Sequence, residues 1–259
     1  MHFVLQKVVY LMFQKRIRLA NTVINVDSTM DMEYGGNLAL FTSNEEPDIS
    51  VSVRYAESGE DIGYAKVETI VGGFGVVIPE GVYPRLSLWQ ILSILPLETV
   101  LMEQGTVILH ACYLLHNGEA ILFSGPSGIG KSTQGRLWED AGEGVVINGD
   151  RVLVTPMEYG VQIDSHYLCG TSGICSNKSA PLKAIVLLEK GLQNIITPLK
   201  PLDRFRQIIA QMSYHSDDPL HRILVTKLAE KLLANTEVIH FSCRKDASAV
   251  DCLKEYLTA

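Results

Sequence analysis

The sequence predicts an α/β fold, in which a mixed sheet with flanking helices is preceded by a smaller β-rich N-terminal domain. Two observations support this prediction. From Ile49 to Tyr55, apolar and mostly polar residues alternate, as in a strand with one buried face. After residue 105, short apolar runs typical of buried strands are interspersed with segments of helical periodicity. We therefore place the N-terminal domain at 1–104 and the α/β domain at 105–259.

The N-terminal domain is expected to consist of strands joined by polar turns, with helical structure near its end. Three strands are predicted, at 37–42, 49–55 and 67–78, the last with a glycine-rich bend or bulge. The helical segment lies at 86–103. Ser87 and Gln90 form a capping box that opens it, and Pro96 interrupts it.

The C-terminal domain is expected to combine strands with amphipathic helices. A strand from Val107 and a second from Ala120 are joined by the hairpin signal Asn117-Gly118. A helix is predicted over 133–141. Further strands are predicted at 144–148, 151–155, 161–164, 181–189, 194–199 and 238–243, and further helices at 203–213, at 218–234 and after Asp246.

The segment Gly125–Ser132 matches the phosphate-binding pattern G-x-x-x-x-G-K-[ST] at every required position. A short apolar strand precedes it and a helical segment follows it, as the pattern requires. Glycines let the backbone turn so that successive N–H groups face phosphate oxygens, and the helix adds its positive dipole end. These flanking elements disfavour the alternative, a glycine-rich turn that matches by chance. The predicted nucleotide contacts are Gly125, Pro126, Ser127, Gly128, Ile129, Gly130, Lys131, Ser132 and Thr133.

Three residues receive roles in binding the nucleotide and its metal. Lys131 would reach the β- and γ-phosphates, and the Ser132 hydroxyl would be a ligand of Mg²⁺. Asp150 follows a buried apolar run, and the C-terminal end of such a strand opens into the ligand crevice. Asp150 could therefore hold Mg²⁺, accept a proton from an attacking hydroxyl, or do both. The alternative is an ordinary polar turn at a strand end, which Asn148-Gly149 favours.

His110 is the remaining catalytic candidate. It lies in the strand that pairs with the one leading into the glycine loop, so hairpin geometry could bring it near the phosphates. The alternative is a packed, hydrogen-bonded histidine of the core, which is the commoner role of a single histidine in an apolar strand.

These segments together resemble a known family. Leu109-His110-Ala111, the hairpin, the glycine loop and Asn148-Gly149-Asp150-Arg151-Val152 are similar to the catalytic domain of HPr serine kinases. The phosphate-loop core of that family is related to phosphoenolpyruvate carboxykinase. The resemblance covers residues 110–154 well, and the chain to Leu257 only in the order of its elements. It implies an HPr-kinase/carboxykinase-like core, an active-site role for His110, and assembly into a homo-oligomer.

The sequence departs from that family at several points. Gly149 stands where such proteins usually carry the first aspartate of an Asp-Asp pair, so one carboxylate remains for two tasks. Neither the family's arginine-glycine signature nor its protein-docking helix is recognisable. The chain therefore resembles a divergent, HPr-kinase-like member.

Three functions are compatible with these residues. The first is an ATP-dependent kinase, with GTP left open as the alternative nucleotide, that transfers the γ-phosphoryl group to a hydroxyl, with serine in a peptide, protein or small molecule as the acceptor. The second is a nucleotide-binding regulatory or accessory module with little or no transfer, which the missing aspartate favours. The third is a carboxykinase-like enzyme acting on a small carboxylic acid, but the sequence offers few basic groups to clamp such a substrate.

Several other features have a functional and a structural interpretation. The stretch Cys169–Lys178 could be a lid, with Lys178 neutralising phosphate charge, or a flexible connection. The adjoining His166 and the cysteines of this stretch lack the paired spacing of a zinc site. For Trp138, core packing is favoured over base stacking. Arg151 is either a phosphate clamp or one partner of a surface ion pair.

Composition restricts the partners. The formal net charge is −7 and no dense run of Lys and Arg occurs, so we expect no nucleic-acid surface. No apolar run is long enough to predict a membrane span. The apolar N-terminal residues 3–5 and 8–13 lack the flanks of a signal peptide. Five scattered cysteines without a C-x-x-C pair fit reduced thiols in a cytoplasmic protein.

Overall fold

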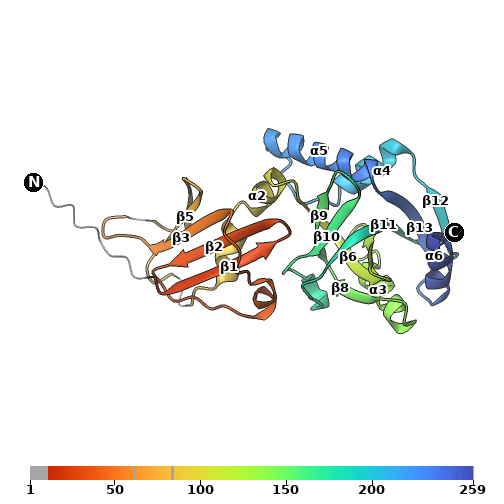
Figure 1. The fold of residues 1–259 in the computed structure, drawn as a ribbon, viewed down its shortest axis with the longest axis horizontal. Helices are drawn as coiled ribbons and strands as arrows, with labels where there is room; N and C mark the ends of the chain where they lie inside the picture. Colours follow the sequence, from red (N-terminus) through yellow and green to blue (C-terminus); the bar gives the residue numbers. More distant parts are fainter. Residues whose placement is uncertain (1–10, 61, 83–84, 259) are drawn as a thin grey trace, which may run out of the picture. The chain divides into compact units, whose positions relative to one another are not determined.

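The structure, a computed structural model, describes residues 11–60, 62–82 and 85–258. The apolar N-terminal residues 3–5 and 8–10 lie outside the described residues. The chain divides into two compact units, and the division falls between Leu97 and Glu98, before the expected position at Gly105. The short segment Leu19–Asn21 belongs to the second unit. The first unit is β-rich and the second is α/β, and each is built on its own mixed sheet (Figure 1).

The first unit contains a five-stranded sheet in the order β1-β2-β3-β5-β4. Strand β3 pairs in parallel with both β2 and β5, whereas β4 and β5 are antiparallel. The predicted strand 67–78 is therefore two strands, which turn at the predicted glycines. The strands are β1 (Phe13–Leu19), β2 (Thr22–Ser28), β3 (Ile49–Tyr55), β4 (Lys66–Ile70) and β5 (Gly73–Ile78).

The strand predicted at 37–42 is wrong, because the 3-10 helix η1 (Gly36–Phe41) occupies this place. Leu38 and Phe41 are both buried and lie three residues apart, whereas Leu40 between them is 48% exposed. This spacing follows the three residues per turn of a 3-10 helix rather than the alternation of a strand.

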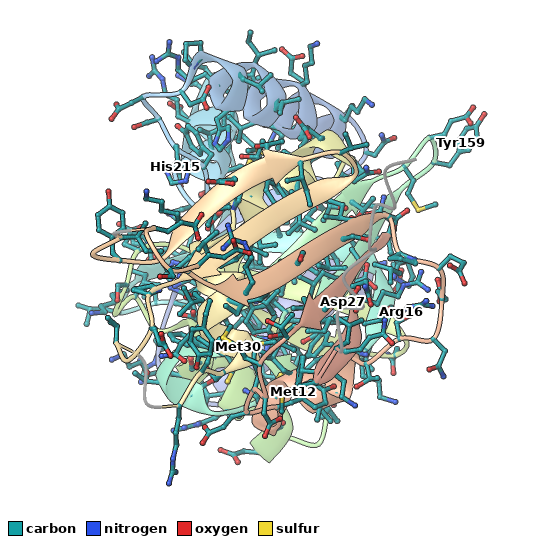
Figure 2. All side chains as sticks on the ribbon, turned by 90° about the vertical axis from the view of Figure 1, so that its left-hand side faces the viewer. Met12, Arg16, Asp27, Met30, Tyr159 and His215 are labelled. Atoms are coloured by element: carbon teal, nitrogen blue, oxygen red, sulfur yellow. The ribbon has the colours of Figure 1, made fainter. Side chains whose placement is uncertain are left out.

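Strands β1 and β2 were not expected from the sequence. Five successive residues of β2, from Thr22 to Val26, are buried, so the strand shows no polar alternation. Polar side chains fasten both strands at the surface, where Figure 2 labels Arg16 and Asp27. Arg16 donates to the carbonyl of Glu45 at 2.9 Å, and Asp27 accepts from Gln14 at 2.8 Å.

Helix α1 (Leu88–Ile94) begins at the predicted capping box, and both hydrogen bonds of the box are present. The Ser87 hydroxyl accepts from the backbone N–H of Gln90, and the Gln90 side chain accepts from the backbone N–H of Ser87. After Pro96 the chain forms α2 (Leu97–Glu103).

The second unit is built on an eight-stranded mixed sheet in the order β10-β9-β6-β7-β11-β13-β12, with β8 pairing to β6. Strand β10 also pairs with β11, so β6, β7, β11, β10 and β9 form a closed ring of hydrogen-bonded strands. We call these five strands the ring. The strands are β6 (Val107–His116), β7 (Glu119–Ser124), β8 (Val145–Asn148), β9 (Arg151–Pro156), β10 (Val161–Ser165), β11 (Ser179–Lys190), β12 (Ile195–Pro198) and β13 (Glu237–Cys243).

Helices cover this sheet on two sides (Figure 1). Alternate residues of β6 separate two cores: Leu109 and Tyr113 pack with the face that α4 and α5 cover, and Cys112 packs with the face that α3 and α6 cover. Helix α5 begins at the predicted Asp218, whose carboxylate accepts from the Leu220 N–H. The helices are α3 (Lys131–Asp140), α4 (Pro201–Ile209), α5 (Pro219–Ala234) and α6 (Ser248–Thr258), with the short 3-10 helix η2 (Gly170–Ser172). Among the described residues, no helix is long and apolar enough to cross a bilayer.

Candidate functional site

The glycine loop connects the end of β7 to the start of α3 (Figure 1). Three of its glycines have positive φ angles, of 138° at Gly125, 74° at Gly128 and 122° at Gly130, a region that favours glycine. Helix α3 begins at Lys131 without a side-chain cap, so its first N–H groups have no capping side chain. The loop thus combines a tight turn with the positive end of a helix dipole.

The Lys131 side chain folds back over this loop. Its Nζ donates to the carbonyl of Gly125 at 2.9 Å and to that of Pro126 at 3.3 Å, and the residue is only 7% exposed. Burial lowers the pKa of Lys131, while the nearby Asp150 carboxylate opposes this shift. Two neutral carbonyls therefore hold the ammonium group at the loop, and an anion can replace them.

Asp150 and His110 are brought together by the sheet. Strands β6 and β9 are antiparallel and pair His110 with Arg151, and the Ala111 N–H donates to the Asp150 carbonyl at 3.0 Å. His110 Nε2 lies 3.3 Å from Asp150 Oδ1, and Arg151 Nε lies 3.5 Å from Asp150 Oδ2. Both carboxylate oxygens therefore face a donor.

The charge state of His110 follows from its surroundings. Burial and then the positive charge of Lys131 lower its pKa, and the Asp150 carboxylate only partly offsets this. The imidazole is therefore mainly neutral near pH 7, and its Nε2–H can donate to Asp150 in that tautomer.

Asn148 is a positioning residue that the sequence analysis did not single out. It is fully buried, and its Oδ1 accepts from the N–H groups of Asp150 at 2.9 Å and Arg151 at 3.1 Å. Its Nδ2 donates to the carbonyls of His166 at 2.6 Å and Leu168 at 3.1 Å. The sequence Asn-Gly-Asp is typical of such a turn. The Asn148 side chain fixes the backbone of Asp150 and thereby the position from which its carboxylate extends.

Gly149 is required by the packing of η2. A Cβ at this position would lie 2.1 Å from the Ser172 Oγ and 2.4 Å from the Ser172 Cβ. Ser172 is itself fixed, because its Oγ donates to the Cys169 carbonyl at 2.6 Å and accepts from the Ile174 N–H at 3.2 Å. The space beside Gly149 is therefore filled by a serine from another segment.

A cavity of about 280 Å³ joins these groups. Of the predicted nucleotide contacts, those at 127, 128 and 130–133 line it, whereas Gly125, Pro126 and Ile129 do not. Lys178 does not line it either, but Lys245 does, a residue that no sequence motif marks. The lining residues are His110, Ser127, Gly128, Gly130, Lys131, Ser132, Thr133, Gly149, Asp150, Cys169, Thr171, Ser172 and Lys245.

Three other candidates lie outside the cavity lining. Trp138 is fully buried and packs edge-on against His116, at 5.1 Å between ring centroids, so its core role is confirmed. Arg151 pairs with Asp150 at the surface. His166 is buried, and its Nδ1 accepts from the Leu168 N–H at 2.9 Å. Among the described residues, no three His, Cys, Asp or Glu side chains are grouped to hold a metal ion.

Comparison with known proteins adds little to this geometry. No family model matches the chain, and no curated protein matches it. Among solved structures, the chain is similar to the Hpr(Ser) kinase/phosphatase from Coxiella burnetii. The sequence identity is 15%, the TM-score is 0.32, and the match covers 58% of this chain and 93% of that one.

Proposed function

We propose that this chain is an ATP- and Mg²⁺-dependent kinase that transfers the γ-phosphoryl group to a hydroxyl, with serine of a peptide, protein or small molecule as the acceptor. One observation carries the proposal: the glycine loop, Lys131, Ser132, Asp150 and His110 meet at a single cavity at the start of α3. These are the groups that bind a triphosphate, and a carboxylate that can accept a proton lies beside them.

Binding rests on the loop and on Lys131. The backbone N–H groups at the start of α3 would donate to phosphate oxygens, and the helix dipole favours the same negative charge. Lys131 Nζ would exchange its bonds with the Gly125 and Pro126 carbonyls for charge-assisted bonds with the β- and γ-phosphates. The phosphates carry a charge opposite to that of the ammonium group, whereas the carbonyls are neutral, so the exchange favours the bound nucleotide.

The donor set at the cavity fits Mg²⁺. This ion prefers oxygen ligands and usually takes only one or two carboxylates in addition to phosphates. The Ser132 hydroxyl and the Asp150 carboxylate both line the cavity. Ser132 Oγ lies 3.3 Å from the carbonyl of Gly149, the neighbour of Asp150. When bound there, Mg²⁺ would neutralise charge on the transferring phosphoryl group.

Asp150 is the group that accepts the proton. The acceptor oxygen bonds to the γ-phosphorus as the bond from that phosphorus to the β–γ bridging oxygen breaks, and the hydroxyl proton passes to the carboxylate. The nucleoside diphosphate leaves with the bridging oxygen. His110 and Arg151 hold the carboxylate from two sides, so its orientation does not depend on the acceptor.

A nucleotide-binding module without transfer is the competing function, and one observation favours it. Among the described residues, the site contains a single carboxylate, whereas the family that the sequence resembles has two. Ser172 fills the space beside Gly149, where the second carboxylate would lie. Under this alternative the protein binds ATP and moves no phosphate.

Two substitutions and one assay separate these functions. Purified protein is incubated with γ-labelled ATP, Mg²⁺ and serine-containing peptides, and both labelled acceptor and ADP are measured. Asp150→Asn keeps the shape of the side chain, so we expect nucleotide binding to persist while transfer falls by about 10²- to 10⁴-fold. Lys131→Ala should lose both binding and transfer, and Lys200→Ala, at an exposed lysine away from the cavity, should lose neither. Transfer at the wild-type rate in Lys131→Ala or Asp150→Asn would refute the mechanism, and binding without any turnover in the wild type would favour the module.

A further inference from the structure

The cavity contains a second lysine, from a part of the chain far from the glycine loop. Lys245 lies in the turn between β13 and α6 and lines the cavity together with Lys131, Ser127 and Gly128. No motif surrounds Lys245, so the sequence alone predicts no role for it.

Hydrogen bonds fix the turn that carries Lys245. The Arg244 N–H donates to Asn194 Oδ1 at 2.9 Å, and the Arg244 guanidinium pairs with Asp246 at 2.7 Å. The Asp246 carboxylate also accepts from the Ser248 N–H at 3.1 Å, at the start of α6. The residues on either side of Lys245 are thus both held in place.

The same turn is fastened to the helix that begins at Lys131. Gln134 lies on α3, one turn after Lys131, and is only 2% exposed. Its Nε2 donates to the Arg244 carbonyl at 3.0 Å and to Cys243 Sγ at 3.1 Å. The backbone of the Lys245 turn therefore keeps its position relative to the first turn of α3.

The charge of Lys245 is not neutralised by the protein. Among the described residues, no carboxylate lies within ion-pair distance of Lys245, whereas its neighbour Arg244 is paired with Asp246. Asp150 is the only carboxylate among the described residues that line the cavity, and it already faces His110 and Arg151. Two ammonium groups in one cavity, in a chain of net charge −7, indicate a polyanionic ligand.

We propose that Lys245 is a second phosphate-binding cation, which contacts the polyphosphate of the nucleotide from the β13–α6 turn. The proposal rests on the proposed function, because it needs a nucleotide at the glycine loop. Lys131 approaches from the helix start and Lys245 from a separate turn, so the two groups divide the charge of the polyphosphate between them. A flexible, exposed lysine contributes mainly electrostatic attraction, which salt screens.

The test is a calorimetric titration of MgATP and MgADP into the wild type and Lys245→Ala, Lys245→Arg and Lys190→Ala. Lys190 is the matched control, because it is exposed and lies opposite Cys243 at the end of β11 but does not line the cavity. We expect Kd to rise about tenfold in Lys245→Ala, to stay within about threefold of the wild type in Lys245→Arg, and to be unchanged in Lys190→Ala. The affinity lost in Lys245→Ala should shrink as the salt concentration rises.

Two negative results have different meanings. If the wild type binds nucleotide and Lys131→Ala weakens binding while Lys245→Ala does not, the role of Lys245 is refuted and the proposed function stands. If the wild type binds no nucleotide, the proposed function fails and the role of Lys245 fails with it. Equal losses in Lys245→Ala and Lys190→Ala would show a general charge effect and would also overturn the proposal.

Discussion

Replacing Asn148 by alanine should destabilise the second unit even when no ligand is bound. The Asn148 side chain is fully buried and makes four hydrogen bonds of 3.1 Å or less. Two are accepted from backbone N–H groups of the Asp150 turn, and two are donated to carbonyls of the segment before η2. Alanine leaves all four partners without a bond from this position.

The magnitude follows from these four bonds. A hydrogen bond contributes about 0.5–1.5 kcal/mol net to stability, so the four together contribute about 2–6 kcal/mol. Asn148→Asp is the informative companion, because it has the same shape and retains the acceptor. It places a carboxylate oxygen against the carbonyls of His166 and Leu168, and it should be at least as destabilising at pH 7.

Urea denaturation followed by tryptophan fluorescence measures this effect. The chain has two tryptophans, and a Trp89→Phe background leaves Trp138 to report on the second unit alone. Asn235→Ala is the control, because Asn235 is exposed and donates one long side-chain bond, of 3.3 Å, to the Lys231 carbonyl. It should cost less than about 1 kcal/mol. An Asn148→Ala protein within about 0.5 kcal/mol of its background would show that Asn148 does not organise the turn.

Two further predictions concern Gly149 and His166. Gly149→Ala should cost about 1–3 kcal/mol because its Cβ would meet Ser172, and adding Ser172→Gly should recover part of that loss; additive denaturation energies would contradict the steric account. Burial lowers the pKa of His166 to about 3, so the unfolded chain takes up the proton first. The free energy of unfolding should therefore fall as the pH drops from about 6.5 towards 3, by up to about 1.4 kcal/mol per pH unit. In His166→Asn, the slope of the unfolding free energy against pH should fall by the equivalent of about one proton. If denaturation curves at several pH values give the same slope as in the wild type, burial of His166 is not its cause.

Local signals in the sequence predicted part of the fold. The capping box at Ser87 is a pattern of adjacent residues, and the structure confirms it. The helix predicted at 218–234 is also confirmed, as α5. Strand β2 was missed because burial on both faces removes the alternation that marks a strand. The error at η1 has a related cause, since the sequence does not show that Leu40 is exposed, and a run of six residues is too short for its apolar pattern to separate a 3-10 helix from a strand.

In the candidate site too, the residues that stand in local patterns were predicted and those that tertiary packing places were not. The glycine loop and Asp150 were predicted because each stands in a short pattern beside a buried strand. A position of His110 near the phosphates was inferred only from hairpin geometry and a resemblance, and the register of β6 with β9 supplies its contact with Asp150. Lys245 could not be predicted, because it reaches the cavity through tertiary packing from a distant segment. Ser172 belongs to the stretch 169–178 that was considered as a lid, but its place beside Gly149 also depends on tertiary packing.

Strands β10 and β11 of the closed ring hold both ends of the connection that carries η2. The connection from β10 to β11 leaves the ring and returns to it, and on the way it supplies Cys169, Thr171 and Ser172 to the cavity. Beyond Leu168, this connection stays bonded to the segment that carries Asp150: the Ser176 N–H donates to the Ile147 carbonyl at 2.9 Å, and the Gly149 N–H donates to the Ile174 carbonyl at 3.4 Å. We therefore expect a substitution within residues 169–178 to act on the cavity twice, through the side chains that line it and through the position of Asp150.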